Sequence, residues 1–322
     1  MNNRTSFASR LIGKNSRQGN WYVPLIIFGV FASVLAFSAP DFATSQNASN
    51  LLAQAMPLII VAIGQMIVIV LAGMDLSVGS VMSMTTAILA LDGSPLVLIP
   101  LAFLAAALVG AINGVAIVKL NVHPIIATLS MQFVVVGIAQ LLRPVAGGSV
   151  PDIVVTLVTG SLFGVPAVVI WAIVVVGISW RLLHGSRFGL HLFAIGGGVS
   201  SGQDDAAHNF GLSDQRNIIL AYVLSALFAA LAGFFIAGRI ASGDPGVGSQ
   251  FALDSVTAVA IGGTQLSGGI GSLHGTIFGA LLMALLANGM NLANLSAFLQ
   301  GAIKGVILLL VVALQSRKKM GL

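Results

Sequence analysis

Three charged side chains interrupt long apolar stretches of this sequence. Asp75 follows residues 42–74, which contain no Asp, Lys or Arg. Asp254 and Lys304 stand at the two ends of a similar stretch, 255–303. A charge within a membrane is costly, and such residues commonly mark a substrate or ion pathway. These three side chains are therefore candidates for lining a transport path.

Each of these charges also has a structural interpretation. Asp is a good N-cap residue, and both aspartates precede short apolar segments that could begin as helices. A buried Lys304 must pair with an anion or reach water, and an Asp of a short span could be its structural partner. The sequence leaves both interpretations open.

Neutral polar residues within apolar stretches form a second group of candidates. A path for a polyol needs hydrogen-bonding groups and no countercharge, although such residues more often tie two helices together. The candidates are Ser77, Asn113, Ser255, Thr257, Thr264, Gln265, Asn291 and Gln300.

Several kinds of chemistry are excluded. The chain has no Cys, so disulfides and cysteine-bound metals are impossible, and its five His residues show no metal-ligand spacing. The Gly13-Lys14 pair is followed by Asn15, which does not fit a phosphate-binding loop. We expect neither an enzyme nor a cofactor or metal in this chain.

The composition indicates a membrane protein. Hydrophobic residues make up 57% of the 322 residues and charged residues only 7%, against roughly 25% in soluble proteins. A spanning helix needs about 20 apolar residues. We predict an all-α, polytopic transmembrane bundle in one domain, 1–322, with ten spans: 22–39, 51–72, 77–91, 96–118, 123–142, 163–183, 217–238, 253–266, 273–292 and 297–315.

Basic residues predict the orientation of the bundle. With the N-terminal tail 1–20 in the cytoplasm, two basic residues fall outside, Arg143 and Arg239, and eleven fall inside. Both termini are then cytoplasmic, which requires an even number of spans. This placement at span ends and tails argues against nucleic acid as the reason for the net charge of +5. The eleven are Arg4, Arg10, Lys14, Arg17, Lys119, Arg181, Arg187, Arg216, Arg317, Lys318 and Lys319.

Two further features concern packing and the path. The third and eighth spans are short for a full crossing, and paired short or interrupted spans in two halves of a chain point to a transport path. Glycines four residues apart favour close helix contacts. Such pairs are Gly110/Gly114, Gly275/Gly279 and Gly301/Gly305.

Five segments resemble the signatures of the ribose-type ABC sugar permeases. They are Gly73–Ser80, Ala127–Leu129, Phe188–Gly197, Phe251–Thr264 and Leu266–Gly269. The resemblance extends over nearly the whole chain from about residue 20. It implies a bacterial inner-membrane subunit that imports a pentose or hexose by alternating access.

The resemblance also implies partners. They are a second permease subunit, identical or not, cytoplasmic ATP-binding cassette subunits that hold the ATP, and an extracytoplasmic solute-binding protein. Segment 184–216 would dock the ATPase. The docking residues expected from this resemblance are Arg187, Phe188, Gly196, Gly197, Asp204, Asp205, Ala206, Ala207, His208 and Gly211.

One part of the docking segment departs from the family pattern. Gly198 stands where the family usually has Asn, and the segment before Ala206 is longer and contains Asp204 and Asp205. We hypothesise that it fits a dedicated ATPase. Two other functions stay open: a permease for branched-chain amino acids or nucleosides, and a secondary transporter that works without an ATPase.

Overall fold

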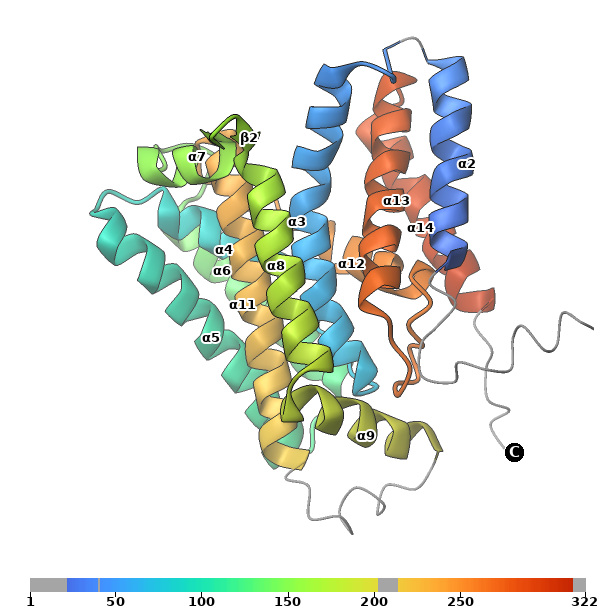
Figure 1. Ribbon diagram of the computed structural model, residues 1–322. Coiled ribbons are helices and arrows are strands. Elements are labelled where there is room, and N and C mark those ends of the chain that lie inside the picture. Colours follow the sequence, from blue (N-terminus) through green and yellow to red (C-terminus); the bar gives the residue numbers. More distant parts are fainter. Residues whose placement is uncertain (1–21, 40, 202–213, 315–322) are drawn as a thin grey trace, which may run out of the picture.

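The computed structural model describes residues 22–39, 41–201 and 214–314. This part of the chain is a helical bundle with one small hairpin (Figure 1). The helices are α2 (Tyr22–Ser38), α3 (Ser45–Val70), α4 (Val78–Leu89), α5 (Pro95–Lys119), α6 (Pro124–Leu142), α7 (Asp152–Thr159), α8 (Ala167–His184), α9 (Arg187–Ser201), α11 (Asp214–Ile240), α12 (Phe251–Ile261), α13 (Leu273–Leu292) and α14 (Ala297–Leu314). Strands β1 (Ser161–Leu162) and β2 (Val165–Pro166) form the hairpin.

Every predicted span corresponds to a helix. Within the described ranges, six helices are long and apolar enough to cross a membrane (α3, α5, α6, α8, α11 and α13), and four apolar helices are shorter (α2, α4, α12 and α14). Three boundaries were wrong by four residues or more: the start of α3, the start of α8 and the end of α12. Helix α8 begins at Ala167 and not at 163, because the β1–β2 hairpin extends to Pro166. Helix α3 begins at Ser45 because Thr44 caps it, its hydroxyl accepting from Asn47 N–H at 3.2 Å. Helix α12 stops at Ile261, since Gly262 and Gly263 follow and Gly263 has a positive φ of 82°.

Helices α3 and α11 form the centre of the bundle, where they pack against each other. Residues 55–70 of α3 are all buried, which explains why this stretch is apolar on every side. Helices on the periphery, such as α5 and α6, bury only a stripe and expose the rest of their apolar surface. That distribution is expected where the surroundings are lipid.

Two groups of four helices, α3–α6 and α11–α14, make corresponding helix contacts. Helix α11 packs against α4 and α5, and α3 packs in the same way against α12 and α13. Helix α6 packs on α4, and α14 packs on α12. In Figure 1, α3 descends where α11 rises, so the groups α3–α6 and α11–α14 are related as inverted repeats. Transporters with such repeats bind substrate near the repeat interface.

The two short helices approach each other at their N-terminal ends. A Cβ atom on Gly79, in the first turn of α4, would overlap the carbonyl oxygen of Gly248, just before α12. A Cβ atom on Gly248 would likewise overlap the carbonyl oxygen of Gly79, so neither position has room for a side chain. The sequence segments that contain Asp75 and Asp254 therefore meet through backbone contact between the two repeats.

Substitution of Gly248 by Ala should lower the stability of the protein by about 1–3 kcal/mol, the usual cost of inserting a methyl group into a packed core. Gly246→Ala is the matched control, because its Cβ would meet only the Asp244 carboxylate oxygen at 3.4 Å. The midpoint of thermal unfolding in detergent measures both. Equal midpoints for the two variants would show that the contact has no energetic weight.

Two of the three predicted glycine pairs make close helix contacts. Gly110 and Gly114 of α5 lie against the backbone of α11, at Tyr222 and Ile219. Gly275 and Gly279 of α13 lie against the backbone of Gly262 and Ala258, at the end of α12. The third pair, Gly301/Gly305 on α14, has no described atom within 4 Å of either added Cβ.

Candidate transport site

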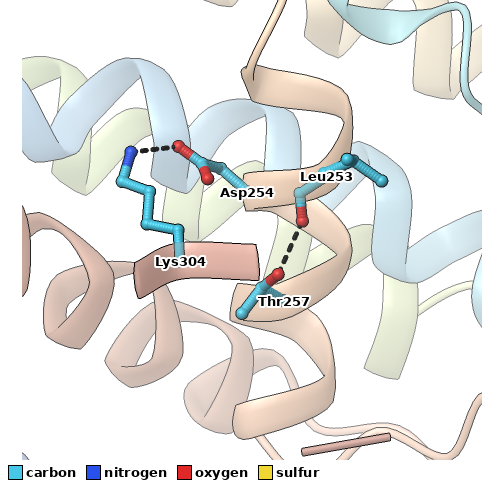
Figure 2. A network of polar contacts seen from close by, with 4 residues as sticks. All are labelled: Leu253, Asp254, Thr257 and Lys304. Atoms are coloured by element: carbon cyan, nitrogen blue, oxygen red, sulfur yellow. Dashed lines mark hydrogen bonds and ion pairs between the residues drawn. The ribbon is translucent and has the colours of Figure 1, made fainter. Parts of the chain in front are cut away.

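An ion pair joins two of the predicted path residues. Asp254 lies in the first turn of α12, and Lys304 lies near the middle of α14. The Lys304 Nζ donates to Asp254 Oδ2 at 2.6 Å, and the two side chains are only 17% and 13% exposed, respectively (Figure 2). The predicted pairing of Lys304 with an Asp of a short span is confirmed. The carboxylate is not a cap, since Gln250 occupies the N-cap position of α12.

Two cavities border this ion pair. The larger, of about 290 Å³, is lined by residues of α3, α11, α12, α13 and α14. Its wall is mostly apolar, and its polar side chains are Gln54, Arg239, Asp254 and Lys304. The smaller, of about 180 Å³, lies between α12 and α14. An apolar cavity with a few convergent polar groups is the usual form of a small-molecule site, and the larger volume is near the lower end of the ~300–1,000 Å³ range.

Sequence reasoning missed two residues of the larger cavity. Arg239 was placed at the outer membrane interface because it follows the apolar stretch of α11, but it borders the cavity. Within the described ranges one ion pair is found, between Lys304 and Asp254, so Arg239 forms none there. Gln54 is a polar residue in the charge-free stretch 42–74, and that position is the sequence signal that could have identified it.

Asp75 belongs to a separate cluster that is fully buried. Its Oδ1 accepts from the backbone N–H and the hydroxyl of Ser77, at 3.0 and 2.6 Å, and its Oδ2 accepts from the Ser225 hydroxyl at 3.0 Å. Asn113 donates to Ser77 Oγ at 3.0 Å. Asp75, Ser77 and Ser225 have 0% exposure. The cluster holds together α5, α11 and the turn between α3 and α4.

Gln65 of α3 completes this cluster. With its amide nitrogen facing the carbonyl of Asp75, Gln65 donates to that oxygen at 3.0 Å and accepts from Asp75 N–H at 3.2 Å. The interpretation of Asp75 as an N-cap is wrong, because Ser77 is the N-cap residue of α4. The carboxylate instead fixes the turn that ends α3 and starts α4.

The other predicted path residues lie in different places. The hydroxyls of Ser255 and Thr257 donate to carbonyls of their own helix, those of Ala252 at 2.8 Å and Leu253 at 2.7 Å. The Thr257 bond is drawn in Figure 2. Thr257 still borders the smaller cavity, whereas Ser255 is buried with 0% exposure. The candidates on α12 are thus divided between the cavity and the core.

Four further candidates lie in the two connections that flank α13 or in the helix turns beside them. Thr264 and Gln265 lie in the connection between α12 and α13. Gln300 donates to Asn291 Oδ1 at 2.9 Å across the opposite connection, between α13 and α14. The predicted set is therefore several clusters, of which only the one around Asp254 and Lys304 adjoins the larger cavity.

The segment predicted to dock the ATPase contains helix α9, which crosses the lower end of the bundle in Figure 1. Arg187 and Phe188 begin this helix. Gly196 lies against the backbone of Val70 and Gly269, and Gly269 N–H donates to the Val70 carbonyl at 2.9 Å. The helix therefore contacts both the end of α3 and the loop after α12. The remaining docking residues, Asp204, Asp205, Ala206, Ala207, His208 and Gly211, lie outside the described residues.

No cluster of three or more His or Asp side chains that could hold a metal ion is found in the described parts of the chain. The site offers hydrogen-bonding groups, one neutralised ion pair and the guanidinium group of Arg239.

Comparisons with known proteins agree with this architecture. Residues 47–312 match the family model described as branched-chain amino acid transport system / permease component. The ribose import permease protein RbsC of Escherichia coli K12 is 34% identical, over 92% of this chain and 93% of its own length. RbsC of Bacillus subtilis is also 34% identical, over 92% of each chain.

A galactose permease is similar over an even larger share of the chain. The galactose/methyl galactoside import permease protein MglC of Escherichia coli K12 is 31% identical, over 98% of this chain and 97% of its own. No solved structure matches significantly. The family match and the near full-length relatives show that this chain is a multi-pass membrane protein and belongs to the permease family of ribose-type ABC importers.

Proposed function

We propose that this chain is the permease subunit of an ATP-driven, binding-protein-dependent importer of a monosaccharide in the bacterial inner membrane. The observation that carries the proposal is the Asp254–Lys304 pair at the edge of the 290 Å³ cavity, which is lined by α3 of the first repeat and by the helices of the second repeat. Ionisable groups within a membrane bundle are retained mainly where they serve a path. The near full-length relatives that import ribose and galactose support a sugar as the substrate.

A sugar fits the chemistry of this cavity. The ion pair is neutral as a whole, so it can donate and accept hydrogen bonds without requiring a countercharge on the substrate. Gln54 adds an amide, and the apolar wall suits the carbon faces of a sugar ring. High affinity would belong to the binding protein, because a tight site in the permease would slow release.

Alternating access would connect this cavity to the ATPase. We propose that α9 receives the movement of the ATPase and passes it on through Gly196 to the end of α3 and to the loop after α12. Because α12 also carries Asp254, a shift of that loop would move one partner of the ion pair. The cavity would then open to alternate sides of the membrane.

A branched-chain amino acid is the second candidate substrate. The description of the matching family names that substrate class, and Arg239 could bind a carboxylate while Asp254 binds an amino group. This arrangement would require Asp254 to leave Lys304. We favour the sugar because the ion pair is already formed and because the relatives named above import sugars.

Reconstitution in proteoliposomes with the ATPase and binding protein tests the function. We expect uptake of labelled ribose or galactose that needs both ATP and the binding protein, and no uptake driven by a proton or sodium gradient alone. Uptake of leucine but neither sugar would favour the amino-acid permease. Uptake without ATP would identify a secondary transporter.

A further inference from the structure

An aromatic cluster joins the last turn of α8 to the first turn of α13. The indole ring of Trp180 stacks on the imidazole of His184, with ring centroids 4.0 Å apart and planes inclined by 19°. The imidazole of His274 approaches the same indole at 4.9 Å and an angle of 56°. All three side chains are exposed, and none of them borders either cavity of the transport site. The cluster therefore has no part in the path described above.

The cluster lies at the end of the bundle that carries most of the basic side chains. Helix α8 ends and α13 begins at the lower end of the bundle in Figure 1, beside the end of α5 and the start of α11. The basic-residue bias predicts that this end faces the cytoplasm, where the membrane surface is rich in anionic lipids. The described basic and imidazole residues at this end are Lys119, His123, Arg181, His184, Arg187, His191, Arg216 and His274.

The face of α8 that leads to the cluster is suited to a lipid chain. Ile173, Gly177, Trp180 and His184 are spaced four, three and four residues apart, so they lie along one face of the helix. Ile173 is 69% exposed, and a Cβ on Gly177 would meet no described atom within 4 Å. This face is therefore apolar and open above the indole ring, and it becomes polar below it.

The length of α8 places the three rings at headgroup depth. The helix has 18 residues and extends roughly 27 Å at about 1.5 Å per residue, close to the ~30 Å thickness of the hydrocarbon. Its last turn, with His184, therefore reaches the boundary between acyl chains and headgroups. Trp is enriched at that boundary because its ring is apolar and its N–H is polar.

The two imidazoles provide donors for an anion. Each imidazole carries at least one N–H group, and protonation adds a second together with a positive charge. His274 lies in the first turn of α13, a helix of 20 residues whose N-terminus has a partial positive charge. An anion beside both rings would also offset the repulsion between two imidazolium groups. A phosphate group has the charge and the acceptor oxygens for this place.

We propose that Trp180, His184 and His274 form a binding site for the headgroup of an anionic phospholipid. The lipid phosphate accepts hydrogen bonds from the two imidazoles, the indole packs beside the glycerol region, and one acyl chain lies along Gly177 and Ile173. A free phosphate ion would lack the acyl-chain contact, so the lipid is favoured. The bound lipid holds the end of α8 against the start of α13. Because only two residues separate α8 from α9, it also steadies the start of α9.

Quenching of Trp180 fluorescence by brominated lipids tests the site. The full chain carries Trp21→Phe and Trp171→Phe, which leaves Trp180 as the remaining one of its three indoles. It is reconstituted into mixed bilayers of phosphatidylglycerol and phosphatidylcholine, in which only one of the two lipids has brominated acyl chains. The two quenching curves together give the binding constant of phosphatidylglycerol relative to phosphatidylcholine. We expect a ratio of roughly five, the factor that one cationic group at an anionic membrane surface contributes.

Variants of the two imidazoles separate a lipid site from a structural contact. In the same background, His184→Ala with His274→Ala should lower the ratio to about one, and His184→Lys with His274→Lys should restore a preference for the anionic lipid. His123→Ala is the matched control, because His123 is exposed at the start of α6 and lies at the same end of the bundle. It should leave the ratio unchanged, as should an excess of inorganic phosphate.

Four results would overturn the inference. They are equal quenching by the two brominated lipids, an unchanged ratio in the double alanine variant, an equal loss in His123→Ala, and loss of the preference on addition of inorganic phosphate. The last result would mean that a soluble anion occupies the site. All variants are compared as monodisperse protein before reconstitution. The measurement does not require transport, so its outcome is independent of the proposed function.

Discussion

Replacement of Lys304 by Met should lower stability by about 3–5 kcal/mol, because it leaves the Asp254 carboxylate without a partner in a poorly hydrated place. Asp254→Asn should have a similar effect through an unpaired ammonium group. The double variant should recover most of the loss, since replacing both partners removes the charge that needs compensation. Thermal unfolding in detergent measures all three variants.

Uptake assays on the same variants separate a structural role from a role in the path. We expect the double variant to be stable and yet to transport roughly ten- to hundredfold more slowly, the equivalent of the ~1.5–3 kcal/mol of a hydrogen bond to a charged group. A stable double variant with the native uptake rate would mean that the ion pair only holds α12 to α14. A double variant no more stable than the singles would contradict the pairing itself.

Substitution of Asp75 by Ala should prevent folding. The carboxylate accepts three hydrogen bonds, from the backbone and side chain of Ser77 and from Ser225, and all three residues have 0% solvent exposure. Each buried donor left without an acceptor costs about 1–3 kcal/mol. Their sum is comparable with the ~5–15 kcal/mol stability of a typical protein. The yield of monodisperse protein from membranes measures this effect.

Two further variants serve as controls for the yield of Asp75→Ala. Asp92→Ala removes an exposed carboxylate in the turn after α4 and should leave the yield unchanged. Asp75→Asn keeps the shape and one acceptor oxygen, and the Ser225 hydroxyl can rotate to accept from the new amide. We therefore expect Asn to restore folding and uptake in part. A folded Asp75→Asn protein with no uptake would instead support the prediction that the Asp75 charge lines the path.

The ten apolar helices were predictable because burial in a bundle or in lipid requires a local run of apolar residues, which is visible in the sequence. The same reasoning found Asp254 and Lys304, because single charges stand out in such runs. It did not find α7, the hairpin or α9, which have short or mixed patterns. The boundary of α12 was misjudged because Thr264 and Gln265 are uncharged and continue the apolar stretch past the glycines that end the helix.

The roles of the polar residues were decided only by the tertiary structure. Asp75 and Asp254 look alike in sequence, since each accompanies a short apolar segment. One is enclosed by hydroxyl donors in the core, and the other meets a lysine that is 50 residues further along the chain and borders two cavities. The residues that enter the bundle could be read from the sequence, because hydropathy is a property of local segments. Which of them meet depends on how distant helices pack, and that packing separates a structural carboxylate from one beside a path.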